Sequence, residues 1–275
     1  MNRKLIFLDV DNTLTHAGGQ VPPESAVKAI KSAQERGHKV FLCSGRNYGM
    51  MRPLYKYGFD GGIASCGGFV FAGDEVLYDD PMPEELKNRL ITLFKENGVS
   101  IELEAKDDSY VDDIAKKHLD KDPDRNSHVL RMIEAVWIEL EPHPLEEYDG
   151  RPVYKSVFVY ENDDQLSSAI AELGDDLMFI LHDFSEPDCK FGEVISRNID
   201  KGSAVRIVAE KLGFDIADTI GFGDSMLDLE LIETVGTSVC MDNGSPMLKE
   251  MSDMVCPSVD EDGIEWGFRK LGLID

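Results

Sequence analysis

The chain is predicted to be an α/β protein with a parallel-sheet core that is interrupted by an inserted α+β domain. Two observations predict this class. Short, continuously apolar runs alternate with amphipathic helical segments near both ends of the chain, which is typical of strands buried on both faces of a parallel sheet. The block between them has strands of alternating polarity, as in an antiparallel sheet. With 275 residues, of which 42% are hydrophobic, the chain can form two cores.

The first part of the chain reads as repeated strand–helix units. Apolar residues between Glu24 and Gly37 recur at helical spacing, and Gly37 is a helix stop signal. The expected elements, in order, are a strand at Leu5–Leu8, a helix ending at Gly37, a strand at Lys39–Cys43, a helix from about 47 to 57 and a short strand at 63–65. Such repeats form a parallel sheet.

The middle of the chain has a different character. Two short apolar runs separated by Gly73–Asp74 predict a hairpin, and an amphipathic helix is expected from 83 to 97. Alternating strands are clearest at 135–140 and 153–160, and the charged segment 107–125 reads as a solvated helix face with an adjoining loop. We expect residues 83–186 to be an inserted α+β domain.

The strand–helix pattern returns near residue 200. Helices are expected at 202–212 and 226–232, and strands at 219–222 and 238–241. Residues 1–82 and 187–275 are therefore predicted to form one discontinuous α/β core.

Composition excludes several classes of function. The formal net charge of −25 repels nucleic acids and anionic lipid, and no protein partner is indicated. The five cysteines have no zinc-site spacing, and their odd number disfavours a complete disulfide framework, so reduced thiols and a cytoplasmic location are expected. The apolar run at the amino terminus is too short for a signal peptide, and no stretch approaches the ~20 apolar residues of a membrane span.

Asp9 and Asp11 stand two residues apart at the carboxyl end of the first strand. Both carboxylates can face the same side, at the edge where open parallel sheets bind ligands. Two adjacent carboxylates require a cation or a shared proton, and oxygen ligands favour magnesium. Asp-x-Asp alone is a weak motif, and polar turn residues at a strand end explain it about as well.

Three further groups of the same core carry polar side chains suited to an active site: Ser44 with its neighbours, Lys201, and Asp224 with Asp228. Ser44, with Gly45 and Arg46, follows the second strand, where a hydroxyl and helix-start N–H groups can hold a phosphate; taken alone, Ser44 is more simply a helix cap. Lys201 begins a helix and can neutralise phosphoryl charge, although most lysines are merely exposed.

Asp224 lies in a loop between two predicted elements, and Asp228 follows four residues later. Asp224 can complete a metal's ligand set, and Asp228 can orient Lys201 or a metal-bound water. Alternatively, both are acids that favour a helix dipole. Four such groups at the strand ends of one sheet are a rare coincidence, so together they predict an active site.

In their order and spacing, these motifs resemble those of the haloacid dehalogenase (HAD) superfamily. They are Asp9-x-Asp11-x-Thr13, Ser44-Gly45-Arg46, Lys201-Gly202 and Gly223-Asp224-x-x-x-Asp228. The large insert resembles the α/β cap of the Cof-type branch, on a Rossmann-like core. Leu227 and Cys66 stand where Cof-type members often have Asn.

The resemblance implies roles for these residues. Asp9 is the implied nucleophile and Asp11 the general acid/base. Mg²⁺ is held by Asp9, Asp11 (through its backbone carbonyl) and Asp224. Asn243 is an implied supporting residue.

The implied reaction is hydrolysis of a phosphate monoester of a small metabolite, such as a sugar phosphate, through an aspartyl-phosphate intermediate. A phosphomutase of the same family and a signalling protein that accepts phosphate without turnover are the alternatives. Receiver domains combine similar residues, but they lack an Asp two residues after the phosphoacceptor.

Overall fold

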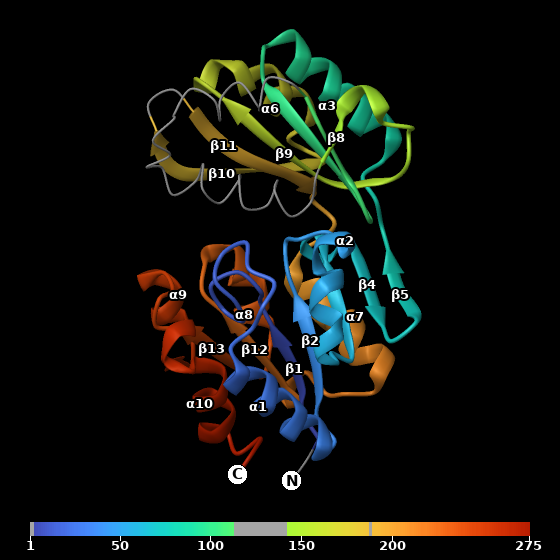
Figure 1. Ribbon diagram of the computed structural model, residues 1–275. Coiled ribbons are helices and arrows are strands. Elements are labelled where there is room, and N and C mark those ends of the chain that lie inside the picture. Colours follow the sequence, from blue (N-terminus) through green and yellow to red (C-terminus); the bar gives the residue numbers. More distant parts are fainter. Residues whose placement is uncertain (1–2, 113–141, 187–188) are drawn as a thin grey trace. The chain divides into compact units, whose positions relative to one another are not determined.

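The computed structural model of the chain describes residues 3–112, 142–186 and 189–275, and it divides into two compact units (Figure 1). The core unit comprises residues 1–46, 51–79 and 200–275, and the inserted unit comprises residues 47–50 and 80–199. None of the helices in the described ranges is long and apolar enough to cross a membrane.

The core unit is built on one eight-stranded sheet. Its strand order is β14-β13-β12-β1-β2-β3-β4-β5. The first six strands pair in parallel, and β4 and β5 are added antiparallel. The bounds are β1 Leu5–Leu8, β2 Lys39–Cys43, β3 Gly61–Ala64, β4 Phe69–Ala72, β5 Glu75–Asp79, β12 Thr219–Gly223, β13 Thr237–Met241 and β14 Met254–Cys256.

Helices cover both faces of this sheet (Figure 1). Leu5 and Phe7 of β1 form a core with residues of α7 (Lys201–Leu212) and α8 (Leu229–Thr234). On the other face, Phe222 of β12 packs against Phe268 of α10 (Gly263–Lys270). The further helical elements are α1 (Glu24–Glu35), α2 (Tyr48–Met51), η1 (Arg52–Tyr57), η2 (Ser65–Gly67), η5 (Ile216–Asp218), η6 (Met226–Asp228), α9 (Pro246–Met251), η7 (Val259–Glu261) and α10 (Gly263–Lys270).

The inserted unit has a second sheet, with strand order β10-β11-β9-β6-β7-β8. All neighbours are antiparallel except β7 and β8. Its strands are β6 Ser100–Ala105, β7 Ser109–Val111, β8 His143–Pro144, β9 Val153–Tyr160, β10 Leu177–Glu186 and β11 Cys189–Ser196. Helices α3 (Glu84–Glu96) and α6 (Ser167–Leu173) pack on one face around a shared apolar core. The short helices are η3 (Leu145–Glu147) and η4 (Asp163–Leu166).

The observed division differs from the expected one at two places. The insert was expected at 83–186, whereas β11 also belongs to the inserted unit because it pairs with both β9 and β10. Residues 47–50 group with the inserted unit as well. Within the charged segment 107–125, Ser109–Val111 is a buried strand rather than helix or loop; the rest of that segment beyond 112, and the strand expected at 135–140, lie outside the described residues.

Candidate active site

Asp9 follows β1 and points toward the helices that pack on that strand. Leu5 and Phe7 pack against α7 and α8, and alternation along a strand places Asp9 on the same side. Its backbone N–H donates to the carbonyl of Phe222 at 3.0 Å, which extends the pairing of β1 with β12. The Asp9 side chain is buried, with 8% exposed. A carboxylate is thereby fixed at the carboxyl end of the sheet.

Lys201 is the first residue of α7, and that helix start is held in two ways. Asp200 caps the helix by accepting a hydrogen bond from the Ser203 N–H at 2.6 Å. A Cβ on Gly202 would lie 2.4 Å from the carbonyl oxygen of Glu230, so only glycine allows this approach of α7 to α8. The Lys201 ammonium consequently reaches Asp9, donating to its Oδ1 at 2.7 Å.

Asp228 supports both Lys201 and the loop before it. Its Oδ1 accepts a hydrogen bond from Lys201 Nζ at 2.5 Å. Its Oδ2 accepts from the N–H groups of Asp224 at 3.0 Å and Ser225 at 3.1 Å. A Cβ on Gly223 would lie 2.6 Å from the Asp228 Cβ, so this glycine makes room for the carboxylate. Both oxygens of Asp228 therefore accept hydrogen bonds, one from Lys201 and the other from the loop that holds Asp224.

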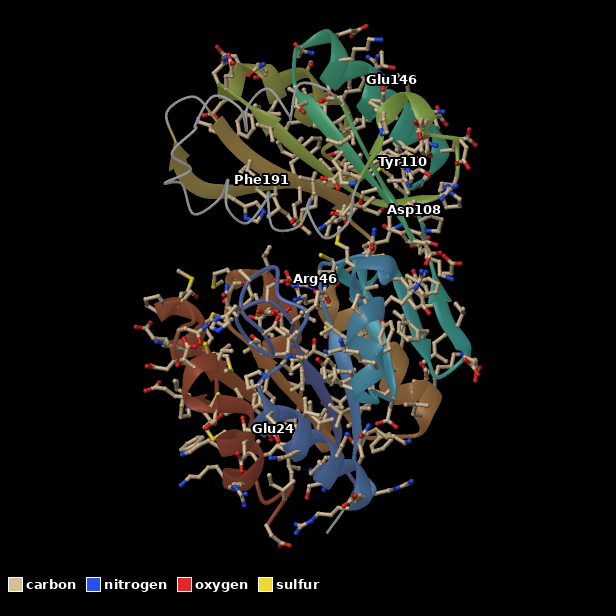
Figure 2. The ribbon with its side chains drawn as sticks, viewed as in Figure 1. Glu24, Arg46, Asp108, Tyr110, Glu146 and Phe191 are labelled. Carbon is tan, nitrogen blue, oxygen red and sulfur yellow. The ribbon has the colours of Figure 1, made fainter. Side chains whose placement is uncertain are left out.

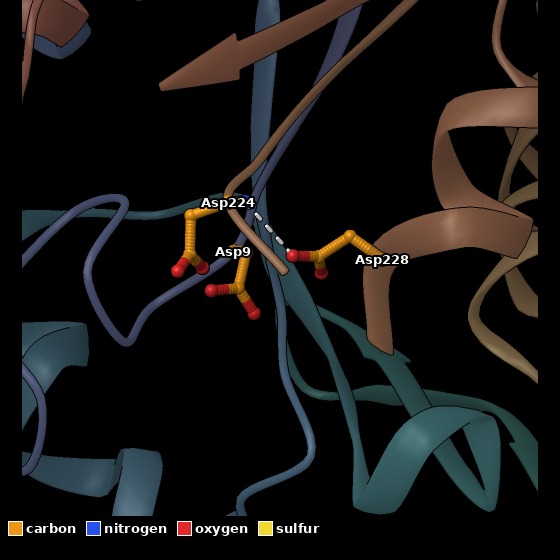
Figure 3. Close-up of side chains that lie close together, drawn as sticks. All are labelled: Asp9, Asp224 and Asp228. Carbon is orange, nitrogen blue, oxygen red and sulfur yellow. Dashed lines mark hydrogen bonds between the residues drawn. The ribbon is translucent and has the colours of Figure 1, made fainter. Parts of the chain in front are cut away.

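Asp9, Asp224 and Asp228 form an acidic cluster (Figure 3). One carboxylate oxygen from each lies within 4.8 Å of the others. Burial and the charge of Asp228 raise the pKa of Asp9 well above its usual value, and the same two causes raise the pKa of Asp224 to about 7. For Lys201, burial acts to lower the pKa, but the charges of Asp228 and Asp9 outweigh it and raise the pKa.

This cluster fits a divalent cation. Three buried carboxylates face one ammonium group, and an added positive charge would stabilise their ionised forms. Carboxylate oxygens are the ligands of a hard cation such as Mg²⁺. Thr13, to which sequence reasoning assigned no separate role, donates to Asp224 Oδ1 at 3.5 Å.

The Asp11 carboxylate lies apart from the acidic cluster. Its two oxygens accept two hydrogen bonds from Arg46, at 2.7 and 2.9 Å, and one from the Gly18 N–H at 2.7 Å. Burial acts to raise the pKa of Asp11, but the hydrogen bond and charge of Arg46 outweigh it and lower the pKa. The Asp11 side chain is thus bound to Arg46 and to the Gly18 N–H, and it is not part of the acidic cluster.

The second motif follows β2, as expected. Ser44 is buried, and its hydroxyl oxygen accepts from the N–H of Arg46 at 3.2 Å, so its proton can still be donated to a phosphate oxygen. Gly45 lies between them and is half-buried. Arg46, labelled in Figure 2, was expected to bind phosphate, but its guanidinium is directed to Asp11.

Two loops support this arrangement. The Asn243 amide donates to the carbonyl of Asn12 at 2.7 Å, which ties the loop after β13 to the loop after β1. Ser65 and Cys66 have positive φ values of 49° and 57°, a strained pair of the kind found at functional sites, and Gly67 follows at 116°, which glycine adopts without strain. The sequence drew attention to Cys66 only as a departure from a pattern, because the backbone conformation leaves no signal in the residue types.

The sequence matches the family described as haloacid dehalogenase-like hydrolase over residues 6–267. The chain belongs to this family. It is 32% identical to “Putative phosphatase YkrA” of Bacillus subtilis strain 168, over the full length of both chains. It is 24% identical to the pyridoxal phosphate phosphatase YbhA of Escherichia coli K12, covering 96% of this chain and 97% of that protein.

Solved structures with the same fold cover nearly the whole chain. A Geobacillus kaustophilus protein superposes with a TM-score of 0.81 at 24% identity, covering 99% of this chain and 100% of that one. The subclass IIB sugar phosphatase BT4131 superposes with a TM-score of 0.78 at 20% identity, covering 98% and 100%. The expected α/β fold with an inserted α+β domain, the HAD family and the class of HAD-type phosphatases are confirmed.

Proposed function

We propose that the protein hydrolyses phosphate monoesters of small metabolites, with Asp9 as the nucleophile and Mg²⁺ as the cofactor. The observation that carries the proposal is the geometry of Asp9. Lys201 holds its Oδ1 at 2.7 Å, and Asp224 and Asp228 lie beside it within the acidic cluster. Within the described residues, Asp9 Oδ2 has no hydrogen bond. A carboxylate fixed through one oxygen presents the other for attack on phosphorus.

The reaction then takes two steps. Asp9 Oδ2 forms a bond to phosphorus as the bond to the leaving oxygen breaks, and Asp11 gives a proton to that oxygen. Because Arg46 lowers the pKa of Asp11, Asp11 takes up this proton when the negative charge of the substrate phosphate lies beside it and opposes that lowering. Water next attacks the aspartyl phosphate while ionised Asp11 takes up its proton, so that phosphate leaves and Asp9 is regenerated. Lys201 offsets negative charge throughout, and Ser44 and Gly45 donate to phosphoryl oxygens.

The cofactor assignment follows from the donor set. Asp9, Asp224 and the backbone carbonyl of Asp11 would hold the ion. When bound, it would neutralise carboxylate and phosphate charge that otherwise repel one another. Asp228 and Asn243 would support the site without touching the substrate.

The substrate is proposed to be a small phosphorylated metabolite, such as a sugar phosphate. Relatives named as a pyridoxal phosphate phosphatase and as phosphatases of 5-amino-6-(5-phospho-D-ribitylamino)uracil support a small-molecule substrate, and the name of a structural neighbour supports a sugar phosphate. We also propose a cytoplasmic location, which agrees with four buried cysteines, Cys43, Cys66, Cys240 and Cys256, being free thiols.

A panel of phosphate monoesters, assayed for phosphate release with and without Mg²⁺, tests the proposal. Many turnovers per enzyme are expected with Mg²⁺ and almost none after chelation. Release of no more than one equivalent would instead indicate a phospho-accepting signalling protein. Formation of an isomeric phosphate ester, with no release of free phosphate, would indicate a phosphomutase.

A further inference from the structure

The Arg46 guanidinium donates hydrogen bonds to other groups of the protein. Its Nε–H donates to Asp11 Oδ2 at 2.9 Å, and its Nη2 donates to Asp11 Oδ1 at 2.7 Å and to the carbonyl of Gly19 at 3.0 Å. Three of its five N–H donors are thus used. The Arg46 side chain is buried, with 8% exposed, so this two-point pairing with Asp11 is stronger than a surface ion pair.

The backbone of Arg46 is fixed as firmly as its side chain. Its N–H donates to Ser44 Oγ at 3.2 Å, and its carbonyl accepts from the Ser65 N–H at 2.8 Å. Ser65 begins the strained pair at the end of β3. Arg46 is therefore held from both neighbouring strand ends before its side chain reaches Asp11.

The pairing also fixes the loop that follows β1. The Gly18 N–H donates to Asp11 Oδ1 at 2.7 Å, and the Gly19 carbonyl that Arg46 binds also accepts from Thr15 Oγ1 at 3.2 Å. Asp11 is exposed on one side, with 36% of its side chain accessible. Arg46 thus sets the direction in which an otherwise accessible carboxylate points.

We propose that Arg46 is a positioning residue that orients Asp11 for proton transfer, and that it does not bind the substrate phosphate. The inference rests on the proposed function, in which Asp11 is the acid and base. A phosphate contact through Nε or Nη2 would break the two-point pairing with Asp11. Only the two N–H groups of Nη1 therefore remain available to a phosphate.

The hydrogen bonds also identify the reacting oxygen of Asp11. Oδ1 accepts two hydrogen bonds, from Arg46 and Gly18, and Oδ2 accepts one, from Arg46. A carboxylate oxygen accepts about two hydrogen bonds, so Oδ2 keeps a lone pair. The proton that goes to the leaving oxygen departs from Oδ2, and the proton taken from water returns to it.

A double-mutant cycle separates positioning from phosphate binding. Arg46→Gln is expected to slow the phosphorylation step for an alkyl phosphate about 100-fold in single-turnover measurements, with KM changed less than about threefold, since a positioned acid contributes 10²–10⁴-fold. In an Asp11→Asn background the same change should have almost no further effect. For p-nitrophenyl phosphate, whose leaving group needs no proton, the loss should be much smaller.

Arg46→Lys should recover part of the rate, because Lys keeps the charge but cannot pair at two points. The surface variant Arg269→Gln, which removes an ion pair with Glu265, is the matched control and should behave as wild type. A large rise in KM for Arg46→Gln, or an undiminished effect in the Asp11→Asn background, would overturn the proposal.

A second measurement does not depend on turnover. Hydrogen exchange at the Gly18 amide should accelerate in both Arg46→Gln and Asp11→Asn, since either change releases the loop, and not in Arg269→Gln. If the wild type hydrolyses no phosphate ester while Gly18 shows this behaviour, the proposed function fails and the pairing stands. Unchanged protection of Gly18 in Arg46→Gln would instead refute the positioning role.

Discussion

Each unit of this protein buries a lysine between two carboxylates, and the two clusters behave differently. In the core unit, Lys201 lies 2.7 Å from Asp9 and 2.5 Å from Asp228. In the inserted unit, Lys155 on β9 lies 3.2 Å from Glu104 on β6 and 3.4 Å from Glu193 on β11. All three residues of the second cluster belong to adjacent strands of one sheet, whereas the first gathers the ends of separate elements.

The carboxylates of the two clusters differ in their pKa values. Burial raises the pKa of Glu104 to about 8, so it is mostly protonated at neutral pH. For Glu193, burial acts to raise the pKa, but Lys155 and His182 outweigh it and lower the pKa to about 2. Glu193 is thus the ionised partner of Lys155. In the core, Asp224 adds a third carboxylate and both Asp9 and Asp224 have raised pKa values, which is the condition that a cation relieves.

The largest expected difference follows from replacing each lysine by methionine. Lys201→Met should lower kcat about 10³-fold or more, because charge on Asp9 and the phosphoryl group is no longer offset. Lys155→Met should act on stability, costing about 3–5 kcal/mol because it removes one partner from a buried ion pair. Phosphate release and thermal unfolding check both variants. A Lys155→Met enzyme that is stable but inactive would show that this cluster also takes part in the reaction.

Metal binding should stabilise the protein through the core cluster of Asp9, Asp224 and Asp228. Adding Mg²⁺ at about 100 times its Kd should raise the unfolding free energy by about 2.7 kcal/mol, and Asp224→Asn should abolish that increment together with activity. Glu104→Gln is the matched control and should retain the Mg²⁺-dependent increment in unfolding free energy. Thermal unfolding across a Mg²⁺ titration measures the effect. An equal loss in Glu104→Gln would contradict the assignment of the ion to the core cluster.

The inserted cluster should make stability depend on pH through Glu104. In the folded protein its pKa is about 8, above the usual value of about 4.5 in the unfolded chain. Its contribution to stability is therefore fully present below about pH 4.5 and is lost as the pH rises through 8, by up to a few kcal/mol. Glu104→Gln should remove this decline. Between pH 5 and 8, the unfolding free energy of the variant should therefore rise relative to that of the wild type. If the unfolding free energies of the two proteins, measured in urea, changed with pH in parallel, the raised pKa of Glu104 would be contradicted.

Glu193 should have the opposite effect on the pH dependence of stability. Its folded pKa of about 2 lies below the unfolded value, so its contribution is present above about pH 4.5 and is lost as the pH falls toward 2. Glu193→Gln should therefore destabilise the protein at pH 7, and its deficit relative to wild type should shrink in acid.

The smallest effects concern single hydroxyl groups. The Thr13 hydroxyl donates to Asp224 at 3.5 Å, so Thr13→Val should lower kcat/KM only several-fold while raising the Mg²⁺ concentration needed for half-activity. Ser156 in the inserted unit is fully buried, and its hydroxyl has no hydrogen-bond partner within the described residues. Ser156→Ala should leave activity unchanged and alter stability by less than about 1 kcal/mol. A large loss of activity in Ser156→Ala would contradict this contrast.

Much of the core could be predicted because its elements are encoded locally. The strands at Leu5–Leu8 and Lys39–Cys43 have the expected bounds, since an apolar run between polar turns specifies a buried strand by itself. The end of the insert was placed too early because the pairing of β11 with β9 and β10 is a long-range property. Alternation along a strand does not reveal which sheet that strand joins.

The sequence alone determined the fold class, the order of the four motifs, the position of three of them after apolar core strands and the position of Lys201 at a helix start, because these depend on neighbours along the chain. Only the tertiary structure decided the partners of each charged group. It directed Arg46 to Asp11, placed Asp228 against both Lys201 and the Asp224 loop, and gave the inserted unit a buried lysine–carboxylate cluster of its own. The physical reason is that electrostatic partners are selected by distance and burial in space, and residue type and spacing fix neither.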